Sequence, residues 1–198
     1  MTHDAIDVIV RLMESMEEKF YTNVIDGVAI KTKMNPTKKQ LEIDEWLLAH
    51  NIINWIMMPD GTTVCVDADV QLSWSGDGRR PQPPFRFGVV RGSFKCGVTD
   101  ISALDWLPHT VKGDFDCSIT PVRNFSGIHK YVKTIDGVFN LPPKSNHVLG
   151  VLMIDGVTKI CMDRGPIDAI FNKYVGTGDI LSAQDELIDA GFVDEARL

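Results

Sequence analysis

The sequence predicts an α+β protein: a short leucine-rich-repeat-like β-solenoid capped by N-terminal and C-terminal helices. A seven-residue pattern, V-x-G-x-F-x-C, occupies residues 90–96 and recurs at 111–117, a displacement of 21 residues. The same displacement carries three spaced apolar residues of 101–107 onto 122–128. A period of about 20 to 29 residues with leucine-like positions is typical of leucine-rich-repeat solenoids. Apolar residues at helical spacing near both ends of the chain predict the caps.

Three regions follow from these patterns: an N-terminal helical or αβ cap at 1–55, the solenoid at 56–164 and a C-terminal helical cap at 165–198. Composition agrees with a folded chain, because 44% of the 198 residues are hydrophobic and 24% are charged.

The N-terminal region predicts two helices with a strand or hairpin between them. Apolar residues recur at helical spacing across 6–16. Aliphatic residues in 24–32 bracket an Asp-Gly pair at 26–27, which is a turn signal. The Asn-Pro-Thr sequence at 35–37 is typical of a helix start, and 41–48 supply an apolar face.

The solenoid region carries further copies of the repeat. Weaker copies lie at 66–72 and 148–154, whereas Thr134 to Gly137 interrupt the alternation, so we expect a degraded turn there. Alternate residues of a strand point the same way, so Val, Phe and Cys of the pattern should face the core, with Cys96 and Cys117 in one buried column. The 148–154 strand would present Leu149, Val151 and Met153 outward, and the C-terminal helices or a partner would have to cover these apolar residues.

The C-terminal region predicts two short helices. An apolar stripe across 167–174 ends at the glycine-rich 176–178, and Asp179 is a suitable N-cap for a helix that Gly191 closes. Those glycines do not predict a phosphate loop, because the lysine and the preceding strand of a P-loop are missing.

Composition also limits the class of function. The formal net charge of −7 argues against general coating of DNA or RNA, which depends on neutralising phosphates. The apolar stretches are far shorter than the roughly 20 residues of a membrane span, and the chain opens without a basic and then apolar leader. We therefore expect a cytoplasmic protein. Its four cysteines are scattered, with no CxxC pair, so buried reduced thiols are expected.

The repeat resembles that of a family of leucine-rich-repeat-like proteins encoded by tailed phages. In that family the pattern P-x-x-V-x-G-x-F-x-C is followed by spaced leucines. Residues 108–117 fit that pattern throughout, 60–72 and 84–88 resemble the family's first repeat, and 178–192 resembles its closing segment. The resemblance covers roughly 56–198 and implies the fold, a phage origin and the host-cell cytoplasm. The chain departs from the family at 73–84, a polar stretch rich in glycine and proline that should form a loop.

The predicted solenoid favours protein binding as the function, because solenoids present extended faces that hold partners. The candidate partner-binding residues are Trp74, Arg79 and Arg80 in the loop and Asp67, Asp69, Arg91, Lys95, Lys112, Asp114 and Asp116 on the sheet face. The alternatives are a variable loop that happens to carry the first three and an ordinary solvated face for the others. The resemblance implies a non-enzymatic phage accessory protein that binds and inhibits a host bacterial protein such as a defence enzyme or toxin.

Two other classes of function remain open. From residue 176 onward, six carboxylates stand against Arg197 alone, so this segment could mimic nucleic acid. Nucleic-acid binding itself would use a basic stripe beside Trp74 and Phe85, formed by Arg79, Arg80, Arg86, Arg91, Lys95 and Lys112. An enzymatic function has little support from the sequence. The five histidines are not spaced like metal ligands, and no base or nucleophile accompanies the carboxylates predicted on the strands. We expect no catalytic residue, metal or cofactor.

Overall fold

The computed structural model describes the backbone of residues 20–25 and 28–33, and residues 36–72, 82–97 and 104–198 with their side chains. The chain divides into two compact units, Met1–Leu41 and Glu42–Leu198. The three-region division made from the sequence stays a prediction. Among the residues described, no helix is long and apolar enough to cross a membrane.

In the first unit, two antiparallel strands form a hairpin. β1 (Phe20–Ile25) pairs with β2 (Val28–Lys33) along its whole length, with Ile25 opposite Val28. This confirms the strand or hairpin predicted at 24–32. The helix predicted at 6–16 lies outside the described residues.

Helix α2 (Lys38–Ala49) begins directly after a capping box, which confirms the predicted start. The Thr37 N–H donates to Gln40 Oε1 at 2.7 Å, and the Gln40 N–H donates to Thr37 Oγ1 at 3.2 Å. These bonds satisfy N–H groups that the first turn of a helix leaves without helical acceptors. From Glu42 on, α2 belongs to the second unit and buries Ile43 and Leu47 in its core.

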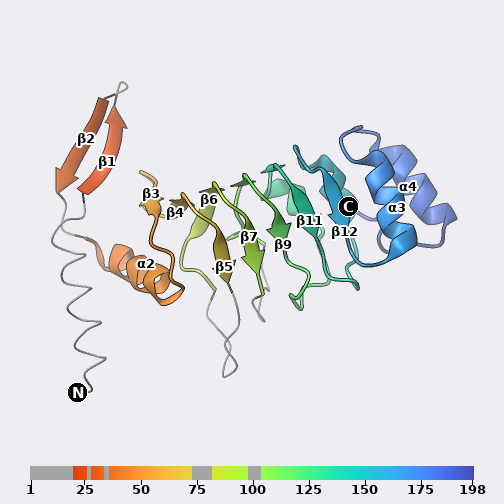
Figure 1. Cartoon of the computed structure of the whole chain (residues 1–198), viewed down its shortest axis with the longest axis horizontal. Helices are drawn as coiled ribbons and strands as arrows, with labels where there is room; N and C mark the ends of the chain where they lie inside the picture. The colour runs from red at the N-terminus through yellow and green to blue at the C-terminus, as the bar shows by residue number, and fades with distance from the viewer. Residues whose placement is uncertain (1–19, 26–27, 34–35, 73–81, 98–103) are drawn as a thin grey trace, which may run out of the picture. The chain divides into compact units, whose positions relative to one another are not determined.

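The second unit is a β-solenoid in which each turn adds a strand to each of two five-stranded sheets. The first sheet contains β3 (Trp55–Met57), β4 (Thr63–Val66), β6 (Arg86–Val90), β8 (Thr110–Val111) and β10 (Thr134–Ile135). The second sheet contains β5 (Val70–Leu72), β7 (Phe94–Cys96), β9 (Phe115–Asp116), β11 (Val138–Asn140) and β12 (Lys159–Cys161), which lie side by side in Figure 1. All pairs are parallel except β3 with β4.

The repeat pattern spans two strands instead of the single strand expected from its alternation. Val90 ends β6, Gly92 lies in the corner between the sheets, and Phe94 and Cys96 belong to β7. Because the corner turns the chain towards the other face of the core, all three apolar residues of the pattern still point inward, and each is fully buried.

Equivalent residues of successive turns stack in three buried columns. These columns are Val66, Val90, Val111 and Ile135; Val70, Phe94, Phe115, Phe139 and Ile160; and Leu72, Cys96, Cys117, Leu141 and Met162. In the second column, the ring centroids of Phe94 and Phe115 are 5.3 Å apart and those of Phe115 and Phe139 are 4.8 Å apart. The shared buried column predicted for Cys96 and Cys117 is therefore confirmed.

The turn that was expected to be degraded is complete, so that prediction is wrong. Strand register pairs Phe94 with Phe115, Phe115 with Phe139, and Phe139 with Ile160, which are spacings of 21, 24 and 21 residues. Residues 135–141 read I-D-G-V-F-N-L and match the repeat at a displacement of 24 from 111–117. A search at one fixed period misses this copy because the loop before it is longer.

The prediction of a strand at 148–154 is also wrong. The segment forms a 3₁₀ helix, η2 (Leu149–Met153), that lies beside η1 (Ile128–Lys130). A 3₁₀ helix has three residues per turn, so the inward and outward alternation of a strand does not apply. Residues 149–152 are all buried, so Leu149 and Val151 face the core instead of solvent, while Met153 is 48% exposed.

The C-terminal helices form as predicted. α3 (Gly165–Tyr174) buries Ile167, Ile170 and Phe171. α4 (Ile180–Asp189) is capped by Asp179, whose side chain accepts a hydrogen bond from the Ser182 N–H at 3.1 Å. Between the helices, Gly176 and Gly178 adopt φ values of +72° and +73°, so the glycines break the helix; Gly191, at +86°, follows α4.

Helix α3 closes the outer edge of the second sheet with one side chain. Asn172 Oδ1 accepts from the Ile160 N–H at 2.8 Å, and Asn172 Nδ2 donates to the Ile160 carbonyl at 2.7 Å. The amide thereby takes the place of a peptide group on the neighbouring strand that β12 lacks. Asp168, one helical turn earlier, accepts from the Met162 N–H at 3.0 Å. Strand pairing ends at β12 because this edge is already hydrogen-bonded.

The corners require glycine because each turn approaches the preceding one closely. A Cβ atom on Gly113 would lie 2.9 Å from the Ser93 nitrogen, and one on Gly137 would lie 2.8 Å from the Gly113 carbonyl oxygen. The equivalent residue of the first turn is Ala68, where no earlier turn of the repeat is present to be displaced.

We predict that Gly113→Ala lowers the free energy of unfolding by about 1–3 kcal/mol, since the new methyl group overlaps backbone that cannot move independently. Urea denaturation would measure this. Gly165→Ala is the control: apart from its chain neighbours, nothing lies within 4 Å of its Cβ position, so the stability should change much less than in Gly113→Ala. Equal stability of both variants would contradict the close approach of the turns.

We predict that Asn172→Ala destabilises the second unit by about 2 kcal/mol, because both polar backbone groups of Ile160 lose their partners. Asn172→Asp keeps an acceptor for the N–H but sets a carboxylate against the carbonyl oxygen, so it should not restore stability. Asp185→Ala, at an exposed position of α4, serves as control. Thermal and urea unfolding monitored by circular dichroism would separate the three variants, and a neutral Asn172→Ala would exclude the edge-capping role.

Candidate functional site

Five of the charged residues that the sequence singled out form ion pairs between adjacent turns: Asp67, Arg91, Lys95, Lys112 and Asp116. At the corners, Arg91 lies 3.5 Å from Asp67 and Lys112 lies 2.8 Å from Asp136. On the outer face of the second sheet, Lys95 lies 3.4 Å from Asp116. Exposed pairs of this kind contribute about 0–1 kcal/mol each, so a partner could replace either member at little cost.

Two predicted partner-binding carboxylates have a structural role in the corners. Asp69 Oδ1 accepts from the Ser93 N–H at 2.7 Å, Ser93 Oγ accepts from the Asp114 N–H at 3.2 Å, and Asp114 Oδ1 accepts from the Val138 N–H at 2.8 Å. Each side chain therefore fixes the backbone of the following turn at the same position. The prediction that Asp69 and Asp114 also bind a partner stays a prediction.

Asp116 is fixed locally as well. Its Oδ1 accepts hydrogen bonds from the Ser118 N–H at 3.0 Å and from the Ser118 hydroxyl at 2.7 Å. Partial burial opposes ionisation, but the bonds from Ser118 together with Lys95 outweigh it and lower the pKa of Asp116. The loop residues Trp74, Arg79 and Arg80 lie outside the described residues.

The structure does not assemble the described members of the predicted basic stripe. Phe85 is 5% exposed and packs edge-on against Trp46, with ring centroids 5.3 Å apart. Arg86 Nη2 donates to the Tyr131 carbonyl at 3.1 Å. Arg91, Lys95 and Lys112 are the cations of the ion pairs described above.

The acidic C-terminal segment is partly neutralised. Glu186 accepts from Lys173 Nζ at 2.6 Å and from the Tyr174 hydroxyl at 2.7 Å, and Glu195, 9% exposed, pairs with Arg164. Asp179 caps α4, as described above. These contacts engage several of the carboxylates that mimicry of nucleic acid would present to a partner.

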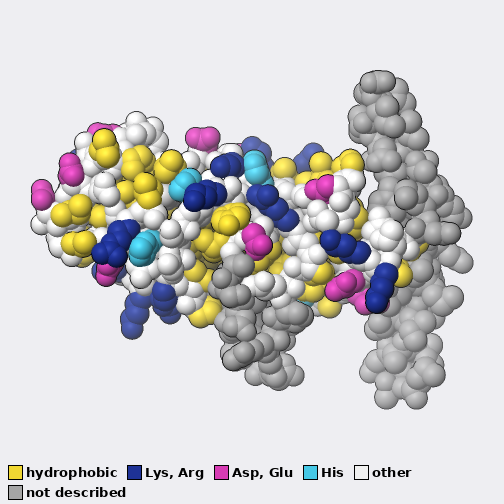
Figure 2. Space-filling model, turned by 180° about the vertical axis from the view of Figure 1, so that it is seen from behind, with side chains coloured by type: hydrophobic (Ala, Val, Ile, Leu, Met, Phe, Trp, Pro, Cys, Tyr) yellow, Lys and Arg dark blue, Asp and Glu magenta, His cyan; other side chains and the backbone are white. Residues whose placement is uncertain are grey.

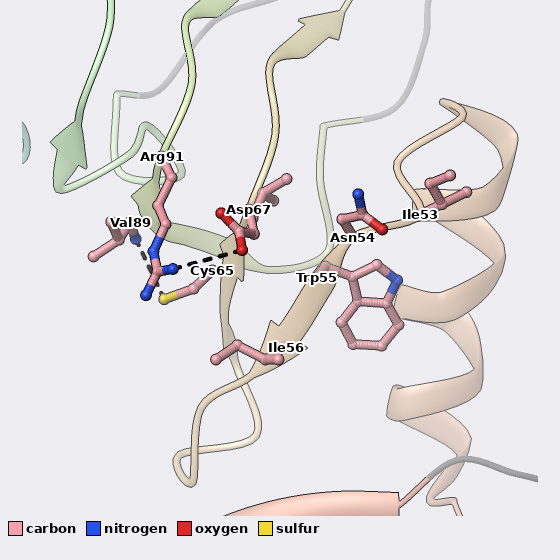
Figure 3. A pocket seen from close by; sticks show the side chains of 9 residues that line it. Ile53, Asn54, Trp55, Ile56, Cys65, Asp67, Val89 and Arg91 are labelled. Atoms are coloured by element: carbon pink, nitrogen blue, oxygen red, sulfur yellow. Dashed lines mark hydrogen bonds and ion pairs between the residues drawn. The ribbon is translucent and has the colours of Figure 1, made fainter.

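Two predicted residues, Asp67 and Arg91, lie at the rim of an open groove of about 550 Å³ on the outer side of the first sheet. Figure 3 shows their ion pair beside the groove's apolar side chains. The residues that line it are Ile53, Asn54, Trp55, Ile56, Cys65, Val66, Asp67, Val89 and Arg91, from the β3, β4 and β6 strands and their ends.

Strand pairing explains the apolar floor of this groove. Ile56 of β3 pairs with Cys65 of β4, so the two side chains share the outer face of the first sheet. Val89 of β6 continues the row, and its N–H donates to Cys65 Sγ at 3.3 Å. Ile53 and Ile56 are 72% and 63% exposed.

Ile53 and Ile56 are not among the site residues predicted from the sequence. The signal was the run of Trp55, Ile56 and Met57: a strand with apolar residues at consecutive positions must show one of them on its outer face. Both residues lie outside the repeat, whose outward positions are mostly charged.

In the described part of the chain, no group of three or more His, Cys, Asp or Glu side chains is placed to hold a metal ion. The four thiols are free. Cys96 and Cys117 are buried, and burial together with the neighbouring Cys96 thiol raises the pKa of Cys117. Cys65 and Cys161 are half-buried.

No protein-family model, curated protein or solved structure matches the chain.

We predict that only two thiols of the native protein react quickly with Ellman's reagent, Cys65 and Cys161, because Cys96 and Cys117 are buried and the reagent cannot reach them. Absorbance at a pH of about 8 would count them, and the other two should react only in denaturant. A Cys65→Ser/Cys161→Ser variant should show no fast phase. Rapid reaction of a third thiol would contradict the buried cysteine column.

Proposed function

We propose that this chain is a protein-binding module that receives an apolar side chain of its partner in the groove of Figure 3. The observation that carries the proposal is the pair of largely exposed isoleucines, Ile53 and Ile56, on the apolar floor formed with Cys65 and Val89. Exposed aliphatic side chains gathered beside an arginine are typical of interaction sites, because their burial supplies affinity that a solvated charged face lacks.

The rim of the groove indicates the chemistry of the partner. The side chains of Arg91 and Asp67 are 70% and 69% exposed, so their pairing is weak and exchangeable. A carboxylate of the partner can take the guanidinium in a bidentate geometry. We therefore infer a partner segment with one aliphatic or aromatic side chain and a nearby acidic residue.

The resemblance of the repeat to tailed-phage proteins supports a finer proposal. In that setting the partner is a host bacterial protein, such as a defence enzyme or toxin, and binding blocks its activity. The proposed role is non-enzymatic, since the groove supplies contact area and one ion pair but no convergent nucleophile and base.

We predict that Ile56→Glu weakens partner binding by about tenfold or more, since it places a charge on the apolar floor of the interface. The tagged protein would capture its partner from a bacterial lysate; the purified partner would then be titrated calorimetrically against each variant. Arg91→Ala should weaken binding by a smaller factor and slow association.

Ile119→Glu is the matched control, because Ile119 is 67% exposed but lies outside the groove. It should keep wild-type affinity. Equal losses in both isoleucine variants, or capture of no protein by the wild type, would exclude the groove as the site. Assays of the partner's own activity with and without the bound chain would separate inhibition from simple recruitment.

A further inference from the structure

A second charged surface lies where the strands of the first sheet begin, at the opposite end of those strands from the ion-paired corners. It uses side chains from three consecutive turns: Arg86 opens β6, His109 immediately precedes β8, and Lys133 immediately precedes β10. Backbone bonds hold the turns together, because the Lys133 N–H donates to the His109 carbonyl at 2.8 Å. The Arg86 guanidinium reaches from its own turn to the Tyr131 carbonyl, two turns away.

Helix η1 adds His129 and Lys130 to this surface. The Lys133 ammonium donates to the His129 carbonyl at 2.8 Å, which orients the lysine. We call Arg86, His109, His129, Lys130 and Lys133 the basic cluster. Figure 2, the view from behind, shows Lys, Arg and His side chains next to one another over the solenoid.

The cations of the basic cluster lack the ion-pair partners that the cations of the corners have. Within the described part of the chain, no carboxylate lies within 4.0 Å of the Arg86, Lys130 or Lys133 side-chain nitrogens, whereas Arg91, Lys95 and Lys112 each have one. Arg86 Nε is buried and has no hydrogen-bond partner. A buried charged donor without an acceptor is unfavourable, so protein acceptors satisfy the half-buried Arg86 guanidinium only in part, and an anion beside it would offset part of that cost.

The pKa values of His109 and His129 are lowered, in part by the neighbouring cations. Burial and then the nearby charges of Arg86 and Lys133 lower the pKa of His109, and burial with Lys130 and Lys133 lowers the pKa of His129. The neighbours that face His109 are therefore Arg86, Lys133 and the Thr110 hydroxyl, which lies 3.2 Å from its Nδ1.

We propose that the basic cluster binds a small oxyanion: inorganic phosphate or the phosphate group of a phosphomonoester. A guanidinium forks onto two phosphate oxygens, and ammonium groups supply point charges around it. Three turns at about 4.8 Å spacing give a patch about 10 Å long, enough for one or two phosphate groups. The net charge of −7 on the whole chain disfavours an extended polyanion there.

Calorimetric titration with inorganic phosphate at low ionic strength tests this directly. We expect saturable binding to one site, and an affinity reduced about tenfold or more in Lys130→Gln/Lys133→Gln. The matched control, Arg91→Gln/Lys112→Gln, removes the same charge from the corners and should change the affinity less than about twofold. Circular dichroism would verify that both variants fold.

Two further arms separate the sources of phosphate. Equal affinity for AMP and for inorganic phosphate assigns recognition to the phosphate group alone, and tighter binding of AMP assigns a phosphomonoester. The proposal is overturned by equal loss in the control, by no saturable binding of either probe, or by binding of a ten-nucleotide single strand without binding of either probe.

Sulfate gives an independent readout because it stays doubly charged across the pH range of interest. Lowering the pH from about 8 towards the lowered pKa values of His109 and His129 increases their protonation, which a bound anion also favours, so sulfate affinity should rise. His109→Gln/His129→Gln should abolish that rise while leaving binding at the higher pH nearly unchanged. A pH-independent wild type would contradict the assigned cluster.

Discussion

The close stacking of one turn upon the next is the constraint on which the rest of this structure depends. Parallel strands in neighbouring turns lie about 4.8 Å apart, so every residue meets its counterpart above and below. A Cβ atom at the corner would meet backbone of the earlier turn, which is why Gly113 and Gly137 stand there. The same spacing stacks Phe94, Phe115 and Phe139 ring against ring and lets a corner side chain such as Asp114 reach the next N–H.

Stacking also creates a problem at the ends, since a solenoid always has a first and a last turn with unpaired edges. At the C-terminal end, Asn172 of α3 satisfies both backbone groups of Ile160 and so replaces a further strand. At the N-terminal end, the first sheet gains the antiparallel strand β3, which cannot continue the parallel repeat. Its central side chain, Ile56, then faces outward because β3 has only one face against the core. The groove is thus a consequence of how the solenoid begins.

Much of the fold could be predicted from the sequence because the repeat is dictated by packing. Inward apolar residues are required wherever turns stack, and a corner Gly wherever one turn follows another, so two good copies suffice to predict the solenoid. The complete turn at 135–141 was missed because strand pairing fixes register while the connecting loops vary in length. The strand expected at 148–154 failed for another reason: continuous apolar residues fit a buried 3₁₀ helix as well as a strand.

The candidate sites were harder to predict, since they depend on which charges find partners in three dimensions. Asp69 and Asp114 look like surface residues in the sequence, yet they hold backbone N–H groups of the next turn. Arg91 was correctly placed on the surface, but its apolar neighbours Ile53 and Ile56 belong to a segment outside the repeat. Exposure of an isoleucine follows from the strand it belongs to, and a single sequence does not show which face of β3 is covered.

The stacking that neutralises the corners leaves the basic cluster unneutralised. In the corner column the signs run Asp67, Arg91, Lys112, Asp136, so each cation finds a carboxylate one turn away. Where the first-sheet strands begin, Arg86 and Lys133 instead flank His109, and among the described residues no carboxylate lies within 4.0 Å of either cation. A neutral imidazole keeps two like charges from lying in adjacent turns. Because the pKa of His109 is lowered on folding, its neutral form favours the folded state above the ordinary histidine pKa, and that stability is lost as the pH falls below it. A bound oxyanion would reverse this loss, which ties the stability of the solenoid to occupancy of the cluster.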